Sequence, residues 1–226
     1  KMSQLTPMMK QYMEIKKQHM DKIVFFRLGD FYEMFFDDAI IASKVLDITL
    51  TGRDCGMDER APMCGIPYHA ADTYIRKLIE NNYKVAICEQ VEDPALAKGI
   101  VKREIIKIIT PGTVTSSIML DDKKNNYLAS IYKSESDIGL SYIDLSTGEF
   151  CSTVIDNDRC NFVIDEVNRL NPSEILMNID DQSISTVYKN SNILDKRYYN
   201  LIECTQRLKI QFKVETIEGL GLDKES

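Results

Sequence analysis

Residues 22–35 read KIVFFRLGDFYEMF, and this stretch decides how the first half of the chain folds. Residues 22–28 form an apolar run rich in aromatic and β-branched side chains, which predicts a buried β-strand. Gly29 and Asp30 close that strand as a turn. The segment that follows is extended, so its side chains alternate and Phe31 and Glu33 point to the same side. The stretch therefore sets an aromatic ring and a carboxylate side by side after a buried strand.

Residues on either side of this strand show alternating helix and strand patterns. Thr6 and Pro7 are a typical helix start, with Thr6 as the N-cap, and predict a first helix that ends near Gln18. Asp37 or Asp38 is expected to cap a second helix. The other elements expected here are a strand at 48–50, a polar irregular stretch at 51–63, a turn-rich loop at 65–69, a helix over 71–79, and strands at 85–88 and 104–109.

The second half of the chain begins after a polar stretch rich in Ser, Asp, Lys and Asn, interpreted as a linker at 115–125. Three strand patterns in quick succession then predict a meander of hairpins. The elements expected here are strands at 127–132, 139–145, 149–155 and 174–177, and helices at 162–170, 183–188 and 203–212. With 226 residues the chain suits two domains of about 100 residues each. We predict a mixed α/β (α+β) protein with domains at 1–114 and 126–226.

Composition excludes several classes of protein. At 44% hydrophobic and 28% charged residues the chain is ordinary globular material. No segment approaches the ~18 apolar residues of a membrane span, and no signal peptide is recognisable, so a cytoplasmic protein without membrane association is expected. Six scattered cysteines without a CxxC pair indicate reduced thiols. With only His19 and His69 as histidines, a zinc site or a His-based catalytic centre is not expected, and we predict no metal site.

The charge is unevenly distributed along the chain. The net charge is −7, which speaks against nucleic acid as a partner of the whole surface. The first 115 residues hold 16 Lys and Arg against 16 Asp and Glu, whereas the remainder holds 12 against 19. A DNA contact that depends on the chain's own charge therefore belongs to the first half, and it should be weak.

Several blocks of sequence carry a resemblance to a known family. In the first half they are GDFYEMF at 29–35, MCGIPYHA at 63–70, VAICEQ at 85–90 and TPGT at 110–113. In the second half they are DLSTGEF at 144–150 and NPSEIL at 171–176. In this order and spacing they resemble the beginning of the bacterial MutS family of DNA mismatch-repair proteins.

The resemblance implies a mismatch-recognition domain at 1–114 and a ribonuclease-H-like connector domain at 126–226. The partners implied are mismatched double-stranded DNA and, through the connector, a MutL-type matchmaker. The family's ATPase domain, with its ATP, its Mg²⁺ and the main homodimer contact, is expected beyond residue 226, because no GxxxxGK[ST] motif occurs in the chain. We therefore expect no catalytic residues and no cofactor here, and a monomer for these 226 residues alone.

The same resemblance assigns roles to Phe31 and Glu33. A mispaired base is stacked less firmly than a paired one, so kinking the duplex there costs less. Phe31 offers a flat apolar face that stacks on any base, worth ~1–3 kcal/mol. A carboxylate at Glu33 is repelled by phosphates wherever no base offers a compensating hydrogen bond, and a protonated Glu33 could donate to a purine ring nitrogen. Residue pattern alone favours another role for Phe31, that of a core aromatic at the end of a strand.

Further candidates lie in segments that the resemblance places near DNA and that are expected to be loops. They are Arg53, Arg60, Met63, Pro67 and His69. Arg53 and Arg60 could hold phosphates, or they could be solvated surface charges. For His69 a helix-capping role is the alternative, and the basic run Lys98, Lys102 and Arg103 is interpreted as solvated.

Two other functions remain open. A ribonuclease-H-like domain could be a metal-dependent nuclease, which needs several carboxylates that converge on two Mg²⁺ ions. Asp144, at the end of a strand, could be a first ligand, and Asp165 and Glu166 lie on the following helix, but no later Asp or Glu is expected near the same point. Asp144 and Glu149 could equally be turn and edge residues. The acidic second half could instead be a protein-docking module.

Overall fold

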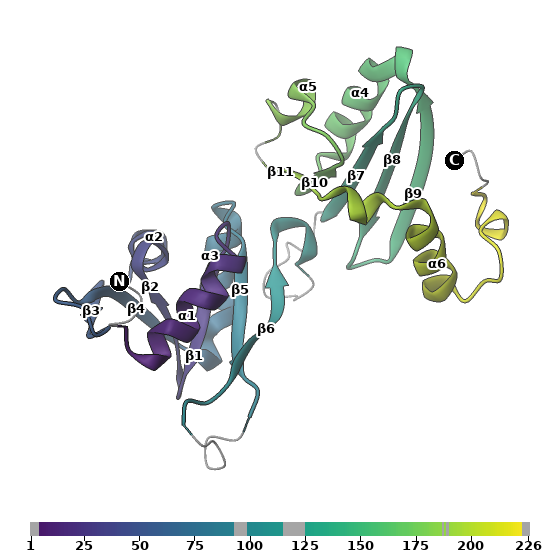
Figure 1. Cartoon of the computed structure of the whole chain (residues 1–226). Coiled ribbons are helices and arrows are strands. Elements are labelled where there is room, and N and C mark those ends of the chain that lie inside the picture. Colours follow the sequence, from purple (N-terminus) through teal and green to yellow (C-terminus); the bar gives the residue numbers. More distant parts are fainter. Residues whose placement is uncertain (1–4, 93–98, 115–124, 187, 189, 223–226) are drawn as a thin grey trace. The chain divides into compact units, whose positions relative to one another are not determined.

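The computed structural model describes residues 5–92, 99–114, 125–186, 188 and 190–222. It is a mixed α/β protein that divides into two compact units, Lys1–Leu120 and Asp121–Ser226. Each unit is built on one mixed β-sheet, drawn in Figure 1. Residues 115–124 of the expected linker lie outside the described residues. None of the helices in the described ranges is long and apolar enough to span a membrane.

The first unit contains a six-stranded sheet with the order β3-β4-β2-β1-β5-β6. Its strands are β1 (Ile23–Leu28), β2 (Phe31–Phe35), β3 (Thr51–Arg53), β4 (Ala61–Pro67), β5 (Val85–Gln90) and β6 (Arg103–Ile109). β1 and β5 are parallel, and the other neighbouring strands are antiparallel. The strand predicted at 22–28 is confirmed as β1, in the middle of this sheet.

Helices cover both faces of this sheet. The helical elements are α1 (Pro7–Gln18), α2 (Phe36–Leu46), α3 (Ala71–Glu80), and the 3-10 turns η2 (Tyr68–Ala70) and η3 (Pro111–Thr113). One core joins strand residues such as Phe25 to α2 and α3, and the other joins Phe26 to α1. Because side chains alternate along a strand, neighbouring residues of β1 enter opposite cores. This is why residues 23–26 are apolar without interruption.

The structure confirms one predicted helix cap and corrects another. The Thr6 hydroxyl accepts a hydrogen bond from the Met9 N–H at 3.4 Å, as expected for the N-cap of α1. Neither Asp37 nor Asp38 caps α2, which has no side-chain cap and begins at Phe36. The carboxylate of Asp38 instead accepts hydrogen bonds from the Tyr12 hydroxyl (3.2 Å) and the Val24 N–H (3.0 Å). Asp38 is therefore a buried link between α1, α2 and β1.

The region between α2 and α3 also differs from the prediction. Residues 48–50 form no strand, and the supposedly irregular stretch 51–63 contains β3 and the start of β4. β3 and β4 contain polar and small residues of low strand propensity, so their sequence alone does not identify them as strands. They are stabilised by pairing, β3 with β4 and β4 with β2. The Gly65–Pro67 part of the predicted loop belongs to β4.

The second unit contains a five-stranded sheet with the order β11-β10-β7-β8-β9. Its strands are β7 (Tyr127–Lys133), β8 (Asp137–Asp144), β9 (Glu149–Asp156), β10 (Glu174–Met177) and β11 (Ser191–Ile193). β7, β8 and β9 form the predicted antiparallel meander, and β10 lies parallel to β7 and β11. This arrangement, with the first strand central and the second antiparallel to it, is that of a ribonuclease-H-like sheet.

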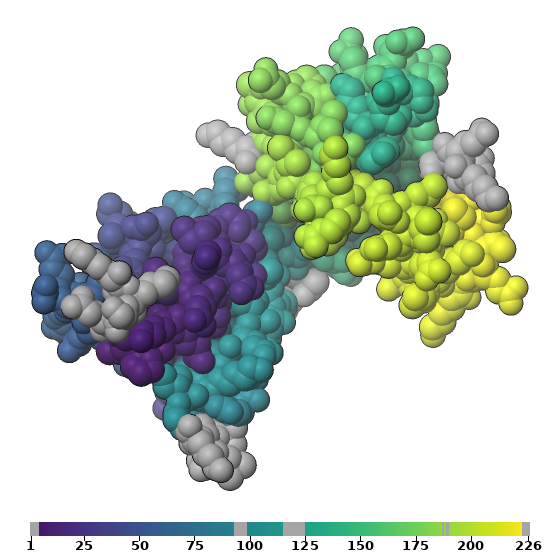
Figure 2. Space-filling model, viewed as in Figure 1, coloured from purple at the N-terminus to yellow at the C-terminus, as the bar shows by residue number. Residues whose placement is uncertain are grey.

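The helical elements of the second unit are α4 (Cys160–Leu170), α5 (Gln182–Ser185), α6 (Leu201–Phe212), η4 (Asn157–Arg159), η5 (Lys196–Tyr199) and η6 (Glu218–Leu220). The core of this unit joins α4 to one face of the sheet, through residues such as Val163, Leu140 and Ile175. α6 has no buried residue, and the outer side of this yellow-green segment is uncovered in Figure 2. Its Phe212 ring stacks on Phe150 of β9 at a centroid distance of 5.9 Å.

Candidate nucleic-acid interface

Strand register gathers most of the candidate residues on one face of the first sheet. Across β2 and β4, Phe31 lies opposite Pro67, Glu33 opposite Gly65, and Phe35 opposite Met63. Across β3 and β4, Thr51 lies opposite Met63 and Arg53 opposite Ala61. Residues directly opposite each other in an antiparallel pair point to the same face. The candidates that share this face are Phe31, Glu33, Arg53, Met63 and Pro67.

Three of these residues were expected in loops, and that expectation is wrong. Arg53 belongs to β3, whereas Met63 and Pro67 belong to β4. The two remaining candidates do lie on connecting segments. Arg60 is exposed between β3 and β4, and His69 is exposed in η2 with its ring 5.8 Å from that of Tyr68. His69 does not cap α3, whose N-cap is Ala70.

α1 covers only part of this face. Phe35 is completely buried and packs in the core formed with α1, whereas 47% of the Phe31 side chain is exposed. Phe31 directly follows the turn at Gly29, whose φ of 57° favours glycine. Its exposure does not fit the alternative in which Phe31 is a core aromatic. The ring instead stands at the open end of β2.

Phe31 and Glu33 line an open groove with a volume of about 600 Å³. The other residues that line it are Asp47, Ile48, Thr49, Thr51, Met63, Cys64 and Gly65. Gly65 faces Glu33 from the adjacent strand and contributes no side chain to the groove. The groove is open to solvent beside the Phe31 ring.

The carboxylate of Glu33 forms an ion pair with the Arg53 guanidinium through Nη1. The two side chains differ in exposure, 15% for Glu33 and 36% for Arg53. They come from β2 and β3, the strands on either side of β4. The charge pair therefore spans β4.

Arg27 holds the turn that precedes Phe31. Its Nε donates a hydrogen bond to the Gly29 carbonyl at 2.6 Å, and its guanidinium lies 3.6 Å from the centre of the Tyr68 ring. The Tyr68 N–H donates in turn to the Asp30 carbonyl at 3.0 Å. The turn is thus tied both to the end of β1 and to η2.

A carboxylate on β5 completes this arrangement. Glu89 pairs with Arg27 Nη1 at 3.2 Å and accepts a hydrogen bond from the Tyr32 hydroxyl. Burial, together with the nearby Glu89 carboxylate, raises the pKa of Tyr32 to about 12, so the hydroxyl stays protonated as a donor. Sequence reasoning missed Arg27 and Tyr68. The available signal was a lone arginine at the end of a buried strand, which requires a partner.

In the second unit, the carboxylate proposed as a first metal ligand has another role. Asp144 is fully buried and accepts hydrogen bonds from the Ser146 N–H (2.8 Å) and hydroxyl (2.6 Å) and from the Asn126 N–H (3.4 Å). Burial raises the pKa of Asp144, but these hydrogen bonds outweigh it and lower the pKa. Asp144 therefore stabilises the β8–β9 turn. Within the described ranges no three His, Cys, Asp or Glu residues are grouped to hold a metal ion.

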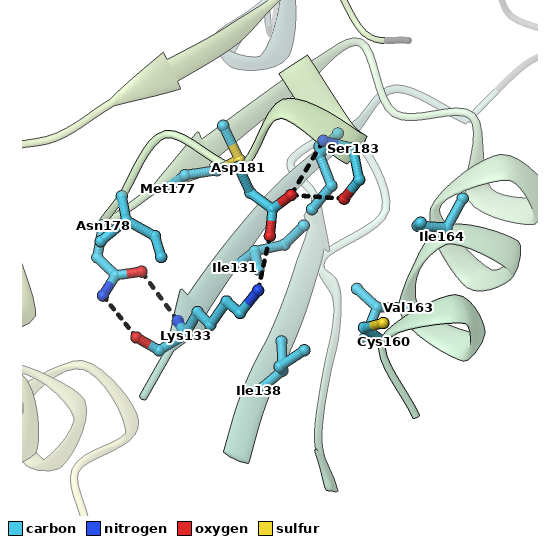
Figure 3. Close-up of a pocket in the computed structure, with 12 residues that line it drawn as sticks. Ile131, Lys133, Ile138, Cys160, Val163, Ile164, Met177, Asn178, Asp181 and Ser183 are labelled. Carbon is cyan, nitrogen blue, oxygen red and sulfur yellow. Dashed lines mark hydrogen bonds and ion pairs between the residues drawn. The ribbon is translucent and has the colours of Figure 1, made fainter. Parts of the chain in front are cut away.

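A small cavity of about 10 Å³ lies beside α4 and α5 (Figure 3). Lys133 Nζ pairs there with Asp181 at 2.9 Å, and the backbone of Lys133 exchanges two 2.9 Å hydrogen bonds with the Asn178 amide. Apolar side chains such as Ile138 and Val163 form much of the remaining wall. The space suits about one water molecule, so it has the character of a packing gap rather than of a ligand site.

Comparison with known proteins gives matches over both units. A family model described as MutS domain I matches residues 6–117, and one described as MutS domain II matches residues 126–226. The DNA mismatch repair protein MutS of Acetivibrio thermocellus is 54% identical over 98% of this chain and 27% of its own length. That of Lachnoclostridium phytofermentans is 52% identical over 98% of this chain and 24% of its own length. The chain thus spans about a quarter of the length of these curated relatives.

Proposed function

The chain belongs to the MutS family, and on that premise we propose that its first unit probes mispaired bases in double-stranded DNA. The observation that carries this proposal is the exposed Phe31 ring at the open end of β2. Single exposed apolar side chains are common, so exposure alone assigns no role. Phe31 also lies in the GDFYEMF block that carries the family resemblance, and it shares one face of the sheet with Glu33 and Arg53, where a partner surface could bind. A base that stacks on the ring provides such a surface.

Phe31 suits a probe that ignores base identity. Its ring has no polar atom that could prefer one base, and stacking on a base is worth ~1–3 kcal/mol. Insertion of a wedge requires unstacking of a base step, which costs a few kcal/mol in regular duplex and less where a base is mispaired. The ring therefore reads how easily the duplex deforms, and it places the kink where stacking is weakest.

Glu33 supplies a second criterion from the same face of β2. Its carboxylate would be repelled by the phosphates of any duplex that approaches the groove. A mispaired base can offset this repulsion by a hydrogen bond to Glu33, whereas in a matched base pair the Watson–Crick edges are already occupied by the pairing. Glu33 therefore lowers affinity everywhere and lowers it least at a mismatch, which increases discrimination.

The second unit is proposed to pass this signal on and to dock a MutL-type matchmaker. Its acidic balance of charges suits a protein partner better than DNA. ATP and Mg²⁺ would bind elsewhere in the full-length protein, where the homodimer contact would also lie. A metal-dependent nuclease is the less favoured function, because the hydrogen bonds to Asp144 occupy the carboxylate that it would need.

The test compares binding of the full-length protein to a duplex with one mismatch and to the matched duplex at one salt concentration. Wild-type protein should prefer the mismatch, and Phe31→Ala should abolish the preference while the melting temperature stays close to that of wild type. Phe162→Ala is the matched control, because it removes a phenyl ring that is 55% exposed on α4. A preference that survives in Phe31→Ala, or that is lost equally in Phe162→Ala, contradicts the proposal.

The role of Glu33 has its own test in the same assay. Glu33→Gln should strengthen binding to matched duplex and reduce discrimination, because it removes a negative charge that faces phosphates. If Glu33 were an ordinary surface residue, its substitution would change the affinities for matched and mismatched duplex by no more than about 0.5 kcal/mol each. Unchanged affinity for matched duplex would therefore leave Phe31 as the sole probe. Salt must be held constant, since the phosphate contribution varies with it.

A further inference from the structure

The ion pair between Glu33 and Arg53 gives each residue a partner before any DNA arrives. Its two members are unequally covered, since the carboxylate is mostly shielded and the guanidinium is more than a third exposed. A guanidinium carries five N–H donors in a planar fork and binds phosphate as readily as carboxylate. Arg53 is therefore held by Glu33 on one side and open on the other.

The pair is weak enough to be exchanged. The Arg53 end of the pair is open to solvent, and ion pairs at the solvent-exposed surface typically shift an equilibrium by no more than about fivefold. Glu33 lines the groove beside Phe31, and Gly65, directly opposite Glu33, has no side chain that would fix the carboxylate. A hydrogen-bonding base at Glu33 and a phosphate at Arg53 would together compensate for the lost ion pair.

We propose that Arg53 and Glu33 exchange partners at a mismatch: Glu33 turns to the mispaired base, and the released Arg53 binds a backbone phosphate. This inference rests on the proposed function of Phe31 and Glu33. Matched duplex offers no bond to Glu33, so the ion pair persists and the charge of Arg53 stays neutralised. Recognition of the base and binding of the phosphate thereby become one coupled event, and Arg53 determines specificity without touching a base.

The exchange differs measurably from simple repulsion by Glu33. Under simple repulsion, Glu33→Gln raises affinity for matched duplex whether or not Arg53 is present. Without its counter-ion the carboxylate would repel more strongly, so the gain would be equal or larger in an Arg53→Gln background. Under exchange the gain comes from the released Arg53, so it disappears when Arg53 is replaced.

A double-mutant cycle in the full-length protein tests this difference. The proteins are wild type, Glu33→Gln, Arg53→Gln and the double variant, each titrated with matched and mismatched duplex over a salt series. For matched duplex, Glu33→Gln should raise affinity by up to about fivefold when Arg53 is in place. The same change should alter affinity by less than about twofold in the Arg53→Gln background, because no arginine remains to be released.

The salt series provides a second readout that counts phosphate contacts. One additional contact steepens the dependence of log affinity on log salt by about 0.9. Glu33→Gln should show this steepening on matched duplex, and Arg53→Gln should show the opposite change on mismatched duplex. An equal gain from Glu33→Gln in both backgrounds, or an unchanged salt slope on mismatched duplex in Arg53→Gln, overturns the exchange.

Arg60→Gln is the matched control, because it removes an equal charge from an exposed position in the same β3–β4 segment. The gain from Glu33→Gln should persist in the Arg60→Gln background. Loss of the gain there would show that any lost positive charge has this effect, and the exchange would be wrong. Arg53→Lys, which keeps the charge, should retain part of the gain and guards against misfolding of Arg53→Gln.

Failure of the exchange is distinguishable from failure of the proposed function. If Phe31→Ala keeps the preference for a mismatch, the proposed function itself is wrong, whatever the cycle shows. If Phe31→Ala abolishes the preference and the cycle is additive, the proposed function stands and the exchange is wrong.

Discussion

The two ends of β2 carry the same side chain in different surroundings. Phe31 and Phe35 are four residues apart on one face of the strand, about 13 Å by strand geometry. Phe35 lies in the core formed with α1, and Phe31 is largely open to solvent. The cover that α1 provides, rather than the aromatic residue itself, decides which ring stabilises the fold and which is exposed to solvent.

The covered end is held by a compact set of contacts. The Tyr12 ring packs edge-on against Phe35 at 4.9 Å and against Phe26 at 5.6 Å. Its hydroxyl donates to the Phe35 carbonyl (3.3 Å) and to Asp38 (3.2 Å). Lys16 Nζ reaches Asp38 at 2.8 Å. If this comparison is correct, substitutions at this end should lower stability in proportion to what they remove.

Phe35→Ala should have the largest effect. Removal of a fully buried phenyl ring leaves a cavity beneath α1 and should lower the free energy of unfolding by about 3–5 kcal/mol. Denaturant titration of the 226-residue chain measures this loss. A loss below about 1 kcal/mol would show that the covered end can rearrange, and the contrast between the two ends would fail.

Asp38→Ala should come next. The change leaves the Val24 N–H without its acceptor and takes the carboxylate away from Lys16, which keeps only backbone carbonyls such as that of Lys22. An unsatisfied buried donor and a broken ion pair predict a loss of about 2–3 kcal/mol. Asp37→Ala, on the same turn of α2 but exposed, is the control and should be close to neutral.

Asp38 should also impose a pH dependence on stability. Burial raises the pKa of Asp38, and this effect outweighs Lys16 and the hydrogen bonds from Val24 and Tyr12. The folded state then holds the proton more tightly than the unfolded state, so stability falls as pH rises from the ordinary carboxyl pKa through the raised one. Asp38→Asn should lack this fall. Unfolding titrations of both proteins over a pH series measure the difference, and an opposite sign would contradict the raised pKa.

Tyr12→Phe removes a single hydroxyl from the same cluster. The rings still pack, so the expected loss is about 1 kcal/mol, the usual worth of one buried hydrogen bond. Thermal unfolding should show a small decrease of the melting temperature. A loss as large as that of Phe35→Ala would mean that the hydroxyl, and not the packing, holds α1 on the sheet.

Phe31→Ala should affect stability least, by no more than about 0.5 kcal/mol, since the ring is exposed and the strand pairing is unchanged. The comparison is sharpest when Phe31→Ala and Phe35→Ala are unfolded side by side. Similar losses for the two variants would show that Phe31 belongs to the core after all.

Sequence predicted the features that depend on local signals. The apolar run 22–28 became β1 and Thr6 became the cap of α1, because burial on both faces and capping chemistry are visible within a few residues. The alternation rule placed Phe31 and Glu33 on one face, and the strand register confirms that placement. The MutS resemblance is confirmed by the matches over both units.

Features that depend on pairing between distant segments were missed. The hairpin of β3 and β4 has no strong strand propensity of its own, so residues 51–63 were expected to be irregular. The contact between Arg53 and Glu33 depends on the register of three strands, which no local pattern reveals. The same holds for Asp38, expected to be a helix cap, whose partners lie on α1 and β1.

The tie made by Arg27 has a consequence for the entropy of binding. Arg27 binds the Gly29 carbonyl and is itself held by the Tyr68 ring and by Glu89, so the turn is already ordered in the folded protein. Loops that become ordered only on association reduce affinity, by about 0.5–1.5 kcal/mol for each flexible side chain that they immobilise. The turn that precedes Phe31 is already ordered in the free protein, so binding would cost no further conformational entropy there. If Phe31 acts as the proposed wedge, its stacking energy would not have to compensate for ordering of this turn.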